Sequence, residues 1–325
     1  MMRVLVTGGA GFIGRKLIAR LLKDGQVGGT AISKITCFDV VAAQGLPADE
    51  RLEIVTGDLS SPTQVGILVG KGQDAIWHLA SAVSGECEQD FDLGYRVNLT
   101  GTLNVLDAAR RAGNVPKMIF TSSVAAFGGP LPDPIPDSQI LTPQTSYGAQ
   151  KAACELFVAD YSRKGMIDGR SLRLPTIVVR PGRPNAAASS FASSIVREPL
   201  AGEQVVCPVA PEAKMYSLSP RRVVDALIHA ITIPSEEIGQ VRSLTLPGLT
   251  YSQAEMMAAL ERVTSKKVVD RVEWKADPFV QKIVSGWPTT FTTPRAEKLG
   301  FERDSSLEEM IQAHIDDELG GSWAK

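Results

Sequence analysis

A tyrosine and a lysine spaced four residues apart, Tyr147 and Lys151, are the side chains best suited to chemistry in this sequence. On a helix this spacing places both side chains on one face. A tyrosine hydroxyl has a reference pKa of about 10, which is too high for an efficient base at neutral pH. A nearby ammonium group favours the phenolate and lowers that pKa. The pair therefore predicts a general base tuned by a neighbouring cation, although surface helices also contain many such pairs.

Ser123 adds a hydroxyl 24 residues before the tyrosine, at the end of the run Phe120-Thr121-Ser122-Ser123. A hydroxyl at a strand end can hydrogen-bond a reacting oxygen and stabilise the charge that develops on it. Strand-end capping or turn formation is the alternative role for both serines. We expect Ser123 to be catalytic and Ser122 to contact a cofactor or substrate, with Thr121 a poorer candidate.

Side chains so far apart in sequence need a regular frame, and residues 3–176 alternate short apolar runs with helical patterns. This alternation predicts a parallel sheet covered by helices on both faces, with a ligand at the carboxyl ends of the strands. The expected strands are 3–7, 35–39, 53–56, 75–79, 117–122 and 171–176, and the expected helices are 12–24, 61–69, 93–112 and 147–163.

A glycine-rich turn, TGGAGFIG from Thr7 onward, follows the first expected strand. Glycines permit a tight turn and let the backbone approach a pyrophosphate, while the next helix points its N-terminal N–H groups at that anion. Because the turn opens a strand–helix–strand unit, it predicts a dinucleotide site in a Rossmann-type, doubly wound α/β fold. The residues expected to bind the cofactor here are Gly8, Gly11, Phe12, Ile13 and Gly14.

An acidic residue, Asp39, ends the second expected strand, 25 residues beyond Gly14. Its side chain can accept hydrogen bonds from the ribose hydroxyls of the adenosine half of the cofactor, and it would repel a 2′-phosphate. Residues 40–42 offer no compensating positive charge, and Arg15 and Lys16 are as easily solvent-facing helix residues. The pattern favours NAD over NADP, and Arg15 is the residue that keeps NADP open.

Two further strand ends carry candidate cofactor contacts. Asp58 and Leu59 follow the third expected strand, where an acidic side chain can meet the adenine amino group. Capping of the helix that begins near Ser61 is the equal alternative for Asp58. Residues 79–81 follow the fourth strand, where small side chains let the chain pass close to the cofactor, and His78 before them is expected to be a packed strand-end residue.

The alternation breaks down after residue 176, where five prolines between positions 181 and 211 favour loops and short elements. We expect residues 1–176 to form the NAD-binding Rossmann domain. Residues 177–325 are expected to form mainly a smaller C-terminal lid that binds the substrate. Segments near 217–247 are expected to return to the Rossmann domain.

The composition is ordinary for a globular protein, with 44% hydrophobic residues, 22% charged residues and a net charge of −2. No Lys/Arg run marks a nucleic-acid or membrane surface, and no uncharged apolar run approaches the roughly 20 residues needed to span a bilayer. Four scattered cysteines indicate reduced thiols, and three well-separated histidines give no metal-ligand spacing. We expect a soluble, cytoplasmic protein without a metal, and no nucleic-acid or membrane partner.

These motifs together resemble those of the extended short-chain dehydrogenase/reductase superfamily, which includes nucleotide-sugar epimerases and dehydratases. The matching pieces are the glycine turn, Asp39, Asp58, Ser123, the Tyr147/Lys151 pair and Val97-Asn98. The resemblance implies that Asn98 supports the active site and that the protein is a homodimer packed through the helices that hold Asn98 and Tyr147. The remaining residues expected at the cofactor are Asp58, Leu59, Leu79, Ala80, Ser81, Asn98, Ser122, Tyr147, Lys151, Pro175 and Ile177.

Within the superfamily, the stretch 173–191, RLPTIVVRPGRPNAAASSF, and the run REPL at 197–200 are most similar to enzymes that oxidise a four-carbon sugar acid with NAD. The resemblance implies oxidation of the 2-hydroxyl of D-erythronate to the 2-oxo acid. In that reaction Tyr147 would remove the hydroxyl proton, and Ser123 would orient the oxygen. The residues expected to hold the substrate are Ser81, Ser123, Tyr147, Thr176, Arg183, Asn185, Ser189 and Ser190.

Two other functions stay open on the sequence alone. A nucleotide-sugar epimerase or dehydratase would use the same fold, but many such relatives carry a tyrosine in the loop after the serine, where this chain has Phe127-Gly128. Segment 185–191 is also short and hydroxyl-rich, which suits a compact polyol acid. The second alternative is a catalytically silent dinucleotide-sensing protein, against which the intact set of Ser123, Tyr147 and Lys151 argues.

Overall fold

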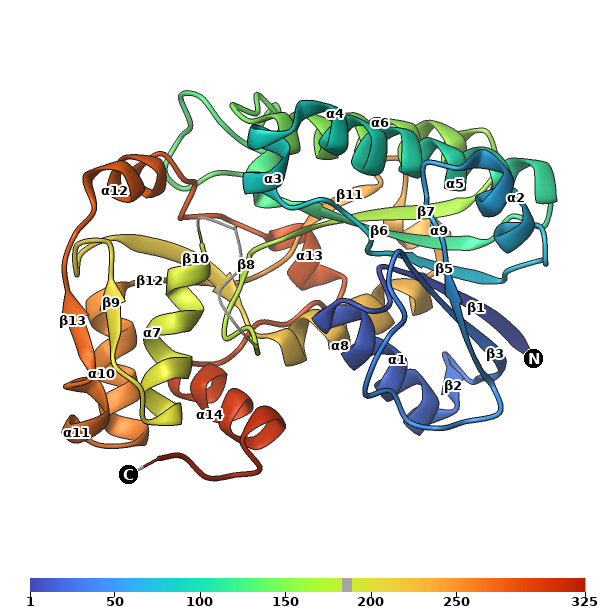
Figure 1. Cartoon of the computed structure of the whole chain (residues 1–325). Coiled ribbons are helices and arrows are strands. Elements are labelled where there is room, and N and C mark those ends of the chain that lie inside the picture. Colours follow the sequence, from blue (N-terminus) through green and yellow to red (C-terminus); the bar gives the residue numbers. More distant parts are fainter. Residues whose placement is uncertain (183–188, 325) are drawn as a thin grey trace. The chain divides into compact units, whose positions relative to one another are not determined.

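The computed structural model describes residues 1–182 and 189–324, and the chain forms two compact units (Figure 1). Unit 1 comprises Met1–Ala126, Leu141–Arg173 and Val224–Thr245. Unit 2 comprises Phe127–Ile140, Leu174–Val223 and Leu246–Lys325. The chain therefore passes from one unit to the other several times, and neither unit is a continuous half of the sequence.

Unit 1 is built on an eight-stranded sheet in the order β11-β7-β6-β5-β1-β3-β2, with β4 also paired to β3. The pairings of β1 with β3 and β5 are parallel, as are β5–β6, β3–β4 and β7–β11, whereas the short β2 pairs antiparallel with β3. The strand order switches direction at β1, where open α/β sheets bind ligands. The strands are β1 (Met2–Thr7), β2 (Gln26–Val27), β3 (Thr30–Asp39), β4 (Leu52–Thr56), β5 (Ala75–His78), β6 (Lys117–Ser123), β7 (Asp168–Leu174) and β11 (Ser243–Thr245).

The register brings the carboxyl ends of the central strands level with one another. Thr7 of β1 lies beside Phe38 of β3 and His78 of β5, and His78 lies beside Phe120 of β6. Residues that follow these positions, including Gly8 and the Leu79–Ser81 stretch, therefore emerge at one edge of the sheet. This edge is where unit 1 positions its functional side chains.

Helices cover both faces of the sheet, with α2, α5 and α6 on one face and α1 and α8 on the other (Figure 1). The apolar strands pack against the first group of helices in a core that includes Leu5, Ile76, Met118, Val105 and Val158. The helical elements are α1 (Phe12–Asp24), α2 (Pro62–Val69), α3 (Ser84–Gln89), α4 (Phe91–Gly94), a π-helical turn (Tyr95–Thr100), α5 (Gly101–Ala112), a 3-10 turn (Val124–Ala126), α6 (Ser146–Arg163), α8 (Pro220–Thr232) and α9 (Ser235–Ile238).

Unit 2 has its own core, built from small sheets and short helices. One sheet has the order β12-β10-β8 and the other pairs β13 with β9. Buried side chains of α7, α10 and α14 form the apolar core with them, among them Ile195, Met256 and Ile311. The elements are β8 (Thr176–Ile177), α7 (Ser190–Ala201), β9 (Val205–Cys207), β10 (Lys214–Leu218), β12 (Leu249–Ser252), α10 (Gln253–Val263), α11 (Lys266–Val269), β13 (Val272–Trp274), α12 (Pro278–Ser285), α13 (Pro294–Lys298) and α14 (Leu307–Glu318).

Three of the expected elements were wrong in extent. The strand expected over 35–39 begins five residues earlier, at Thr30. The strand expected over 171–176 ends at Leu174, since Pro175 has no N–H to continue a ladder, and Thr176 begins β8 in the other unit. The single helix expected over 93–112 is instead α4, the π-helical turn and α5 in succession. The π-helical turn matters because it carries Asn98.

Candidate active site

Helix α6 begins one residue before Tyr147, and two side chains hold its first turn in place. The Thr145 hydroxyl accepts a hydrogen bond from the Gly148 N–H at 3.1 Å, and Glu88 of α3 accepts one from the Ser146 N–H at 2.7 Å. The first N–H groups of a helix have no partner within the helix, so these two acceptors satisfy donors that would otherwise be free. The start of α6 is thereby fixed at the residue that precedes Tyr147.

Gly148 allows this first turn to approach the segment that follows Ser123. A Cβ atom built at Gly148 would lie 2.2 Å from the carbonyl oxygen of Ala125, which is backbone and cannot rotate away. Ala125 belongs to the 3-10 turn after β6, and its N–H donates to the Ser123 hydroxyl oxygen at 3.1 Å. The backbone beside Tyr147 therefore packs directly against the turn that holds Ser123.

Lys151 lies one turn further along α6 and is 3% exposed. Its Nζ donates to the Thr121 carbonyl at 2.7 Å and lies 5.5 Å from the centre of the Tyr147 ring. Burial lowers the pKa of Lys151 to about 8, and a smaller opposing influence comes from Glu155 and two cysteines. The lysine is thus anchored to β6, within reach of the tyrosine, and titrates near the physiological range.

The next turn of α6 carries Glu155, whose carboxylate is buried in an ion pair. Arg173 at the end of β7 donates to it from Nε at 3.0 and 3.1 Å and from Nη2 at 2.7 Å. The hydroxyl of Ser122 donates to the same carboxylate at 2.5 Å. The Ser122 hydroxyl hydrogen therefore points into the interior of unit 1, and the pair links α6 to β6 and β7.

Asn98, in the π-helical turn, is 2% exposed and joins three segments. Its Oδ1 accepts from the Ala82 N–H at 2.8 Å and from the Ser81 hydroxyl at 3.0 Å. Its Nδ2 donates to Gln150 Oε1 of α6 at 2.8 Å and to the Ala82 carbonyl at 3.2 Å. Asn98 thus holds the Ser81 loop against α6, the helix that carries Tyr147 and Lys151.

The glycine turn is packed so closely that a side chain at Gly8 or Gly14 would clash with backbone atoms. Gly8 has φ +72°, and a Cβ there would lie 2.6 Å from the Ala80 nitrogen. A Cβ at Gly14 would lie 2.3 Å from the Gly8 carbonyl oxygen. Gly11 is the N-cap of α1, so the N–H groups of Phe12 and Ile13 lie in the first turn, at the positive end of the helix dipole.

Asp39 ends β3 beside this turn. Its carboxylate accepts hydrogen bonds from the Ala10 N–H at 2.9 Å and from the Val40 N–H at 2.7 Å. A carboxylate has further lone pairs, so Asp39 can still accept from ribose hydroxyls. Arg15 lies nearby on α1, with its Nη1 3.5 Å from the Gln44 carbonyl.

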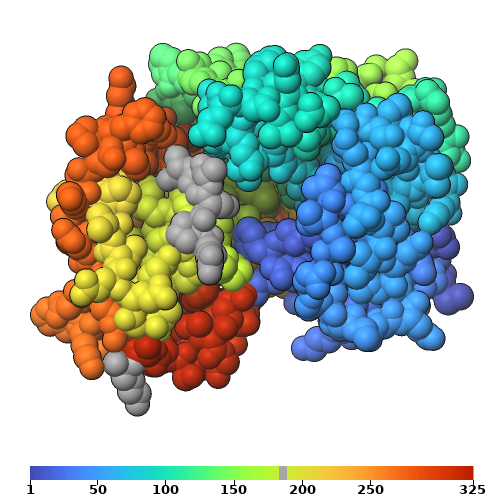
Figure 2. Space-filling view, viewed as in Figure 1, coloured from blue at the N-terminus to red at the C-terminus, as the bar shows by residue number. Residues whose placement is uncertain are grey.

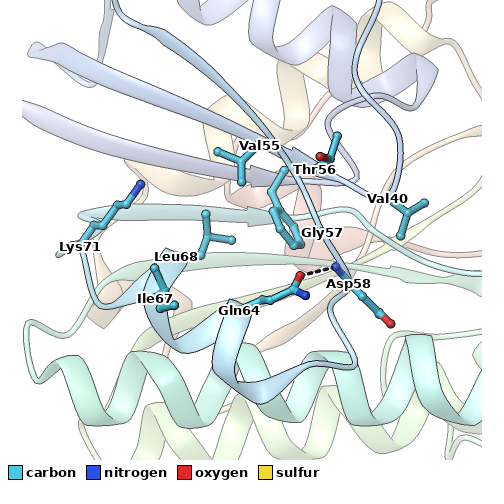
Figure 3. Close-up of a pocket in the computed structure, with 10 residues that line it drawn as sticks. Val40, Val55, Thr56, Gly57, Asp58, Gln64, Ile67, Leu68 and Lys71 are labelled. Carbon is cyan, nitrogen blue, oxygen red and sulfur yellow. Dashed lines mark hydrogen bonds between the residues drawn. The ribbon is translucent and has the colours of Figure 1, made fainter.

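A cavity of about 540 Å³ lies next to Asp39, between β4 and α2 (Figure 3). The Asp58 carboxylate accepts from the N–H and hydroxyl of Ser60, and these bonds lower its pKa. The cap of α2 is Ser61 rather than Asp58, and the Asp58 N–H donates to Gln64 at 2.9 Å, as Figure 3 shows. The cavity is lined by Phe38, Val40, Val55, Thr56, Gly57, Asp58, Gln64, Ile67, Leu68 and Lys71.

The sequence of residues 4–240 matches the family described as NAD dependent epimerase/dehydratase. The chain belongs to this family. Its members are enzymes that use NAD, so the predicted superfamily, fold class and cofactor are confirmed.

Two curated relatives of the chain are called D-erythronate dehydrogenase. The protein from Cupriavidus necator is 50% identical over 322 residues, which covers 97% of this chain and 98% of that protein. The protein from Haemophilus influenzae is 42% identical over 315 residues, which covers 97% of this chain and 99% of that protein.

Solved structures of the family share the whole fold. A nucleoside-diphosphate-sugar epimerase from Agrobacterium tumefaciens has a TM-score of 0.95 at 47% identity, covering 99% of this chain and 95% of that one. The L-threonine 3-dehydrogenase from Trypanosoma brucei has a TM-score of 0.87 at 26% identity, with all of both chains covered. Similar folds therefore occur under the names of both dehydrogenases and epimerases.

The residues of unit 1 fit the NAD of the family. The cradle at Gly8 and Gly14 leaves no room for a Cβ, and it opens onto the first turn of α1, whose N–H groups suit a pyrophosphate. Asp39 ends β3 beside this turn and Asp58 lines the cavity, so both expected contacts lie at the carboxyl ends of strands. Leu79 donates its N–H to the Thr7 carbonyl at 3.1 Å, whereas the Leu59 side chain is buried in the core.

Three residues predicted to bind cofactor or substrate follow β7, at the point where the chain enters unit 2. Pro175 is buried, and Thr176 and Ile177 form β8. In β8, Thr176 lies beside Ser217 and Ile177 beside Leu218 of β10. These contacts position Thr176 and Ile177 within unit 2.

The predicted substrate segment is described in part. Ser189 accepts a hydrogen bond from Arg180 Nη2 at 2.7 Å, and Ser190 is the first residue of α7. Arg183 and Asn185 lie outside the described residues. The expectations for these four residues stay predictions.

Several residues that hold α6 and its neighbours in place are not predicted from the sequence. Glu155 and Gln150 lie on α6, Glu88 on α3 and Arg173 on β7, and apart from Arg173, which begins the 173–191 stretch, none belongs to a motif. The i+4 spacing that joins Tyr147 to Lys151 also joins Lys151 to Glu155, and this was the one available signal.

Within residues 1–182 and 189–324, no group of three or more His, Cys, Asp or Glu side chains is placed to hold a metal ion. In the same part of the chain, no helix is both long enough and apolar enough to cross a membrane. All four cysteines are free and buried. The cytoplasmic location stays a prediction.

Proposed function

We propose that this enzyme oxidises the 2-hydroxyl of a four-carbon sugar acid, D-erythronate, to the corresponding 2-oxo acid. The observation that carries the proposal is the identity of 50% and 42% to two D-erythronate dehydrogenases over nearly the full chain. The arrangement of Ser123, Tyr147 and Lys151 within unit 1 supports it, because oxidation of an alcohol needs a base for its proton.

Bound NAD+ would supply the acceptor for the hydride that leaves C2. Tyr147, as phenolate, takes the proton of the 2-hydroxyl, so the C–H and O–H bonds break as the C=O double bond forms. Ser123 donates a hydrogen bond to the same oxygen and stabilises its partial negative charge. The Lys151 ammonium, anchored to Thr121, favours the phenolate by its charge.

The carboxylate and remaining hydroxyls of the sugar acid need donors. We assign them to Ser81 in unit 1 and to Thr176, Ser189 and Ser190 with Arg183 and Asn185. The support is chemical, since these side chains carry hydroxyl, amide or guanidinium groups and a polyol acid is recognised by such donors. Ser81 is already oriented by Asn98, which leaves its hydroxyl oxygen free to accept.

We also propose a homodimer in which a second copy covers an apolar patch on unit 1. The patch comprises Phe91, Tyr95, Leu156 and Phe157, which are 39–73% exposed although aromatic or aliphatic. Phe91 and Tyr95 stack with ring centres 6.1 Å apart, and segment 84–100 (cyan) forms part of the molecular surface in Figure 2. Exposed apolar patches of this kind indicate interaction sites. Leu156→Glu should convert a dimer to a monomer in light scattering, and an unchanged mass would reject this surface.

A nucleotide-sugar epimerase is the second candidate, because the Agrobacterium structure that is 47% identical bears that name. One feature opposes it. Phe127, where many nucleotide-sugar relatives carry tyrosine, is buried against Phe291 with ring centres 5.4 Å apart and offers no hydroxyl. Epimerisation would also return the hydride to the sugar, so NADH would not accumulate.

The deciding experiment follows NADH absorbance with D-erythronate and NAD+, beside NADP+, L-threonate and a UDP-sugar. We expect NADH with D-erythronate, and the 2-oxo acid identified by mass spectrometry. The UDP-sugar sample is also analysed by chromatography, because an epimerase does not accumulate NADH. An altered UDP-sugar without turnover of either tetronate would establish the epimerase instead. A Tyr147→Phe sample is the matched control for contaminating dehydrogenases.

A further inference from the structure

His78, the last residue of β5, lies in a chain of buried hydrogen bonds that crosses unit 1. Its Nδ1 is 2.6 Å from the Thr7 hydroxyl of β1, and its Nε2 is 2.9 Å from the Thr102 hydroxyl of α5. Thr102 in turn donates to the Asn98 carbonyl at 2.6 Å. All four residues are buried, so water does not compete for these bonds.

The chain has one direction, which the donors and acceptors determine. A carbonyl accepts and cannot donate, so the single hydrogen of the Thr102 hydroxyl is directed to Asn98. The Thr102 oxygen must then accept from His78, which places the ring hydrogen on Nε2. Nδ1 is left as the acceptor for the Thr7 hydroxyl. Burial, with a smaller effect of the Lys151 charge, lowers the pKa of His78 to about 3, so the ring stays neutral.

The ends of the chain are the two halves of the cofactor site. Thr7 precedes Gly8, whose backbone lies against Ala80, and the Ala80 N–H points to the Thr7 hydroxyl at 3.5 Å. Asn98 at the other end holds Ser81 and the catalytic helix. Between the two ends lie the imidazole ring of His78 and the hydroxyl of Thr102.

We infer that His78 is a positioning residue for NAD+, held as the neutral Nε2–H tautomer so that the glycine turn and the Asn98 turn adopt one joint geometry. A side chain here must accept at one end and donate at the other. Imidazole is the one side-chain ring that does both at opposite atoms, whereas a packed apolar strand-end residue would do neither. The inference uses NAD+ binding and is independent of which sugar acid is oxidised.

The tautomer is observable in the unmodified protein without cofactor. In ¹⁵N-labelled protein, nitrogen–proton correlations of the imidazole should show a hydrogen on Nε2 and none on Nδ1 from pH 5 to pH 9. Signals that are lost in His78→Phe belong to His78 and not to His229 or His314. A hydrogen on Nδ1, or titration of the ring in this range, would overturn the inference.

The coupling is measured as NAD+ affinity in a double-mutant cycle of Thr7→Val and Thr102→Val. Both changes interrupt the same chain, so each should weaken NAD+ about tenfold, equivalent to ~1.4 kcal/mol, and the double variant should lose little more than either alone. In a His78→Phe background the two changes should become nearly neutral, because apolar groups then face one another. Effects that simply multiply in both backgrounds would reject the coupling.

The serine variants distinguish hydrogen bonding by the two threonines from a purely structural role in packing. Serine keeps the hydroxyl and loses a methyl group, whereas valine keeps the shape and loses the hydroxyl. The inference expects Thr7→Ser and Thr102→Ser to retain more NAD+ affinity than the valine variants, and simple packing expects the reverse order. Thermal unfolding of each variant without NAD+ identifies any that fails to fold, and the nitrogen–proton measurement on the parent protein stays decisive in that case.

Discussion

Glu155→Gln tests both consequences of the buried Glu155–Arg173 pair, stability and catalysis. The two side chains are 3% and 9% exposed, and three donor–acceptor contacts join them. Glutamine keeps the size but removes the charge, so Arg173 loses its ion pair with this carboxylate. Breaking a buried pair costs about 3–5 kcal/mol, and since the amide oxygen still accepts a hydrogen bond we expect the lower end, ~3 kcal/mol of unfolding free energy.

The same substitution should change the pH dependence of the reaction. Burial is the main cause of the pKa of about 8 at Lys151, and the Glu155 charge partly opposes it. Removing that charge lowers the pKa of Lys151 further, so the ammonium that favours the Tyr147 phenolate is lost at lower pH. We expect the alkaline limb of kcat to move to lower pH by less than about one unit, because Glu155 raises the pKa of Lys151 less than the two neighbouring cysteines do.

The assay combines urea unfolding of the cofactor-free enzyme with kcat measured across the alkaline range. Arg20→Gln is the matched control, because it removes surface ion pairs with Asp24 and Asp225, in which Arg20 is 44% exposed and the carboxylates are 33% and 39% exposed. We expect that control to cost less than about 1 kcal/mol and to leave the pH profile unchanged. Equal urea midpoints for the two variants, or an alkaline limb that coincides with the parent's, would refute the reasoning.

Three further substitutions address the site directly. Gly148→Ala places a methyl group 2.2 Å from the Ala125 carbonyl oxygen. We expect denaturation to show a stability loss of about 1–3 kcal/mol. Steady-state kinetics should show a roughly 100-fold fall in kcat, because the clash displaces Tyr147. Tyr147→Phe should lower kcat by about 10²–10⁴-fold and leave the NAD+ dissociation constant in calorimetry nearly unchanged; an active variant would exclude Tyr147 as the base. Asp39→Ser should raise the KM for NAD+ about tenfold, because a hydroxyl accepts hydrogen bonds from the ribose less strongly than a carboxylate does. It should also reduce the preference for NAD+ over NADP+, because a hydroxyl does not repel the 2′-phosphate. An unaltered NAD+/NADP+ ratio of kcat/KM would contradict the assigned role.

The sequence pattern predicts an element correctly where its position depends on residues of one segment. The first strand, the glycine turn and the start of α6 depend on residues close in sequence, and the structure has them within one residue of the expected positions. The i+4 spacing of Tyr147 and Lys151 is likewise a local property of a helix. Family membership and NAD follow from these pieces, because the dinucleotide motif is itself a strand, a turn and a helix in succession.

The sequence pattern does not predict which residues pair when they are far apart in sequence. Glu155 and Arg173 each look like an exposed charged residue, and their burial depends on the packing of α6 against β7. The helical pitch changes at the π-helical turn that carries Asn98. The spacing of apolar residues over 93–112 does not reveal this change, because the apolar positions on either side remain helical. Transfer of segment 127–140 to unit 2 is decided by contacts such as that of Phe127 with Phe291.

The pairing of β11 with β7 has a consequence during synthesis. Ser171–Arg173 of β7 leave the ribosome about seventy residues before their partners Ser243–Thr245 leave it. During that interval the nascent sheet presents a free edge, the kind of surface on which strands of other chains assemble. A recombinant fragment that stops near residue 174 would keep that edge permanently, whereas one that also carries residues 224–245 would close it. For the same reason, a nonsense mutation between these strands should yield an aggregating product instead of a working nucleotide-binding half.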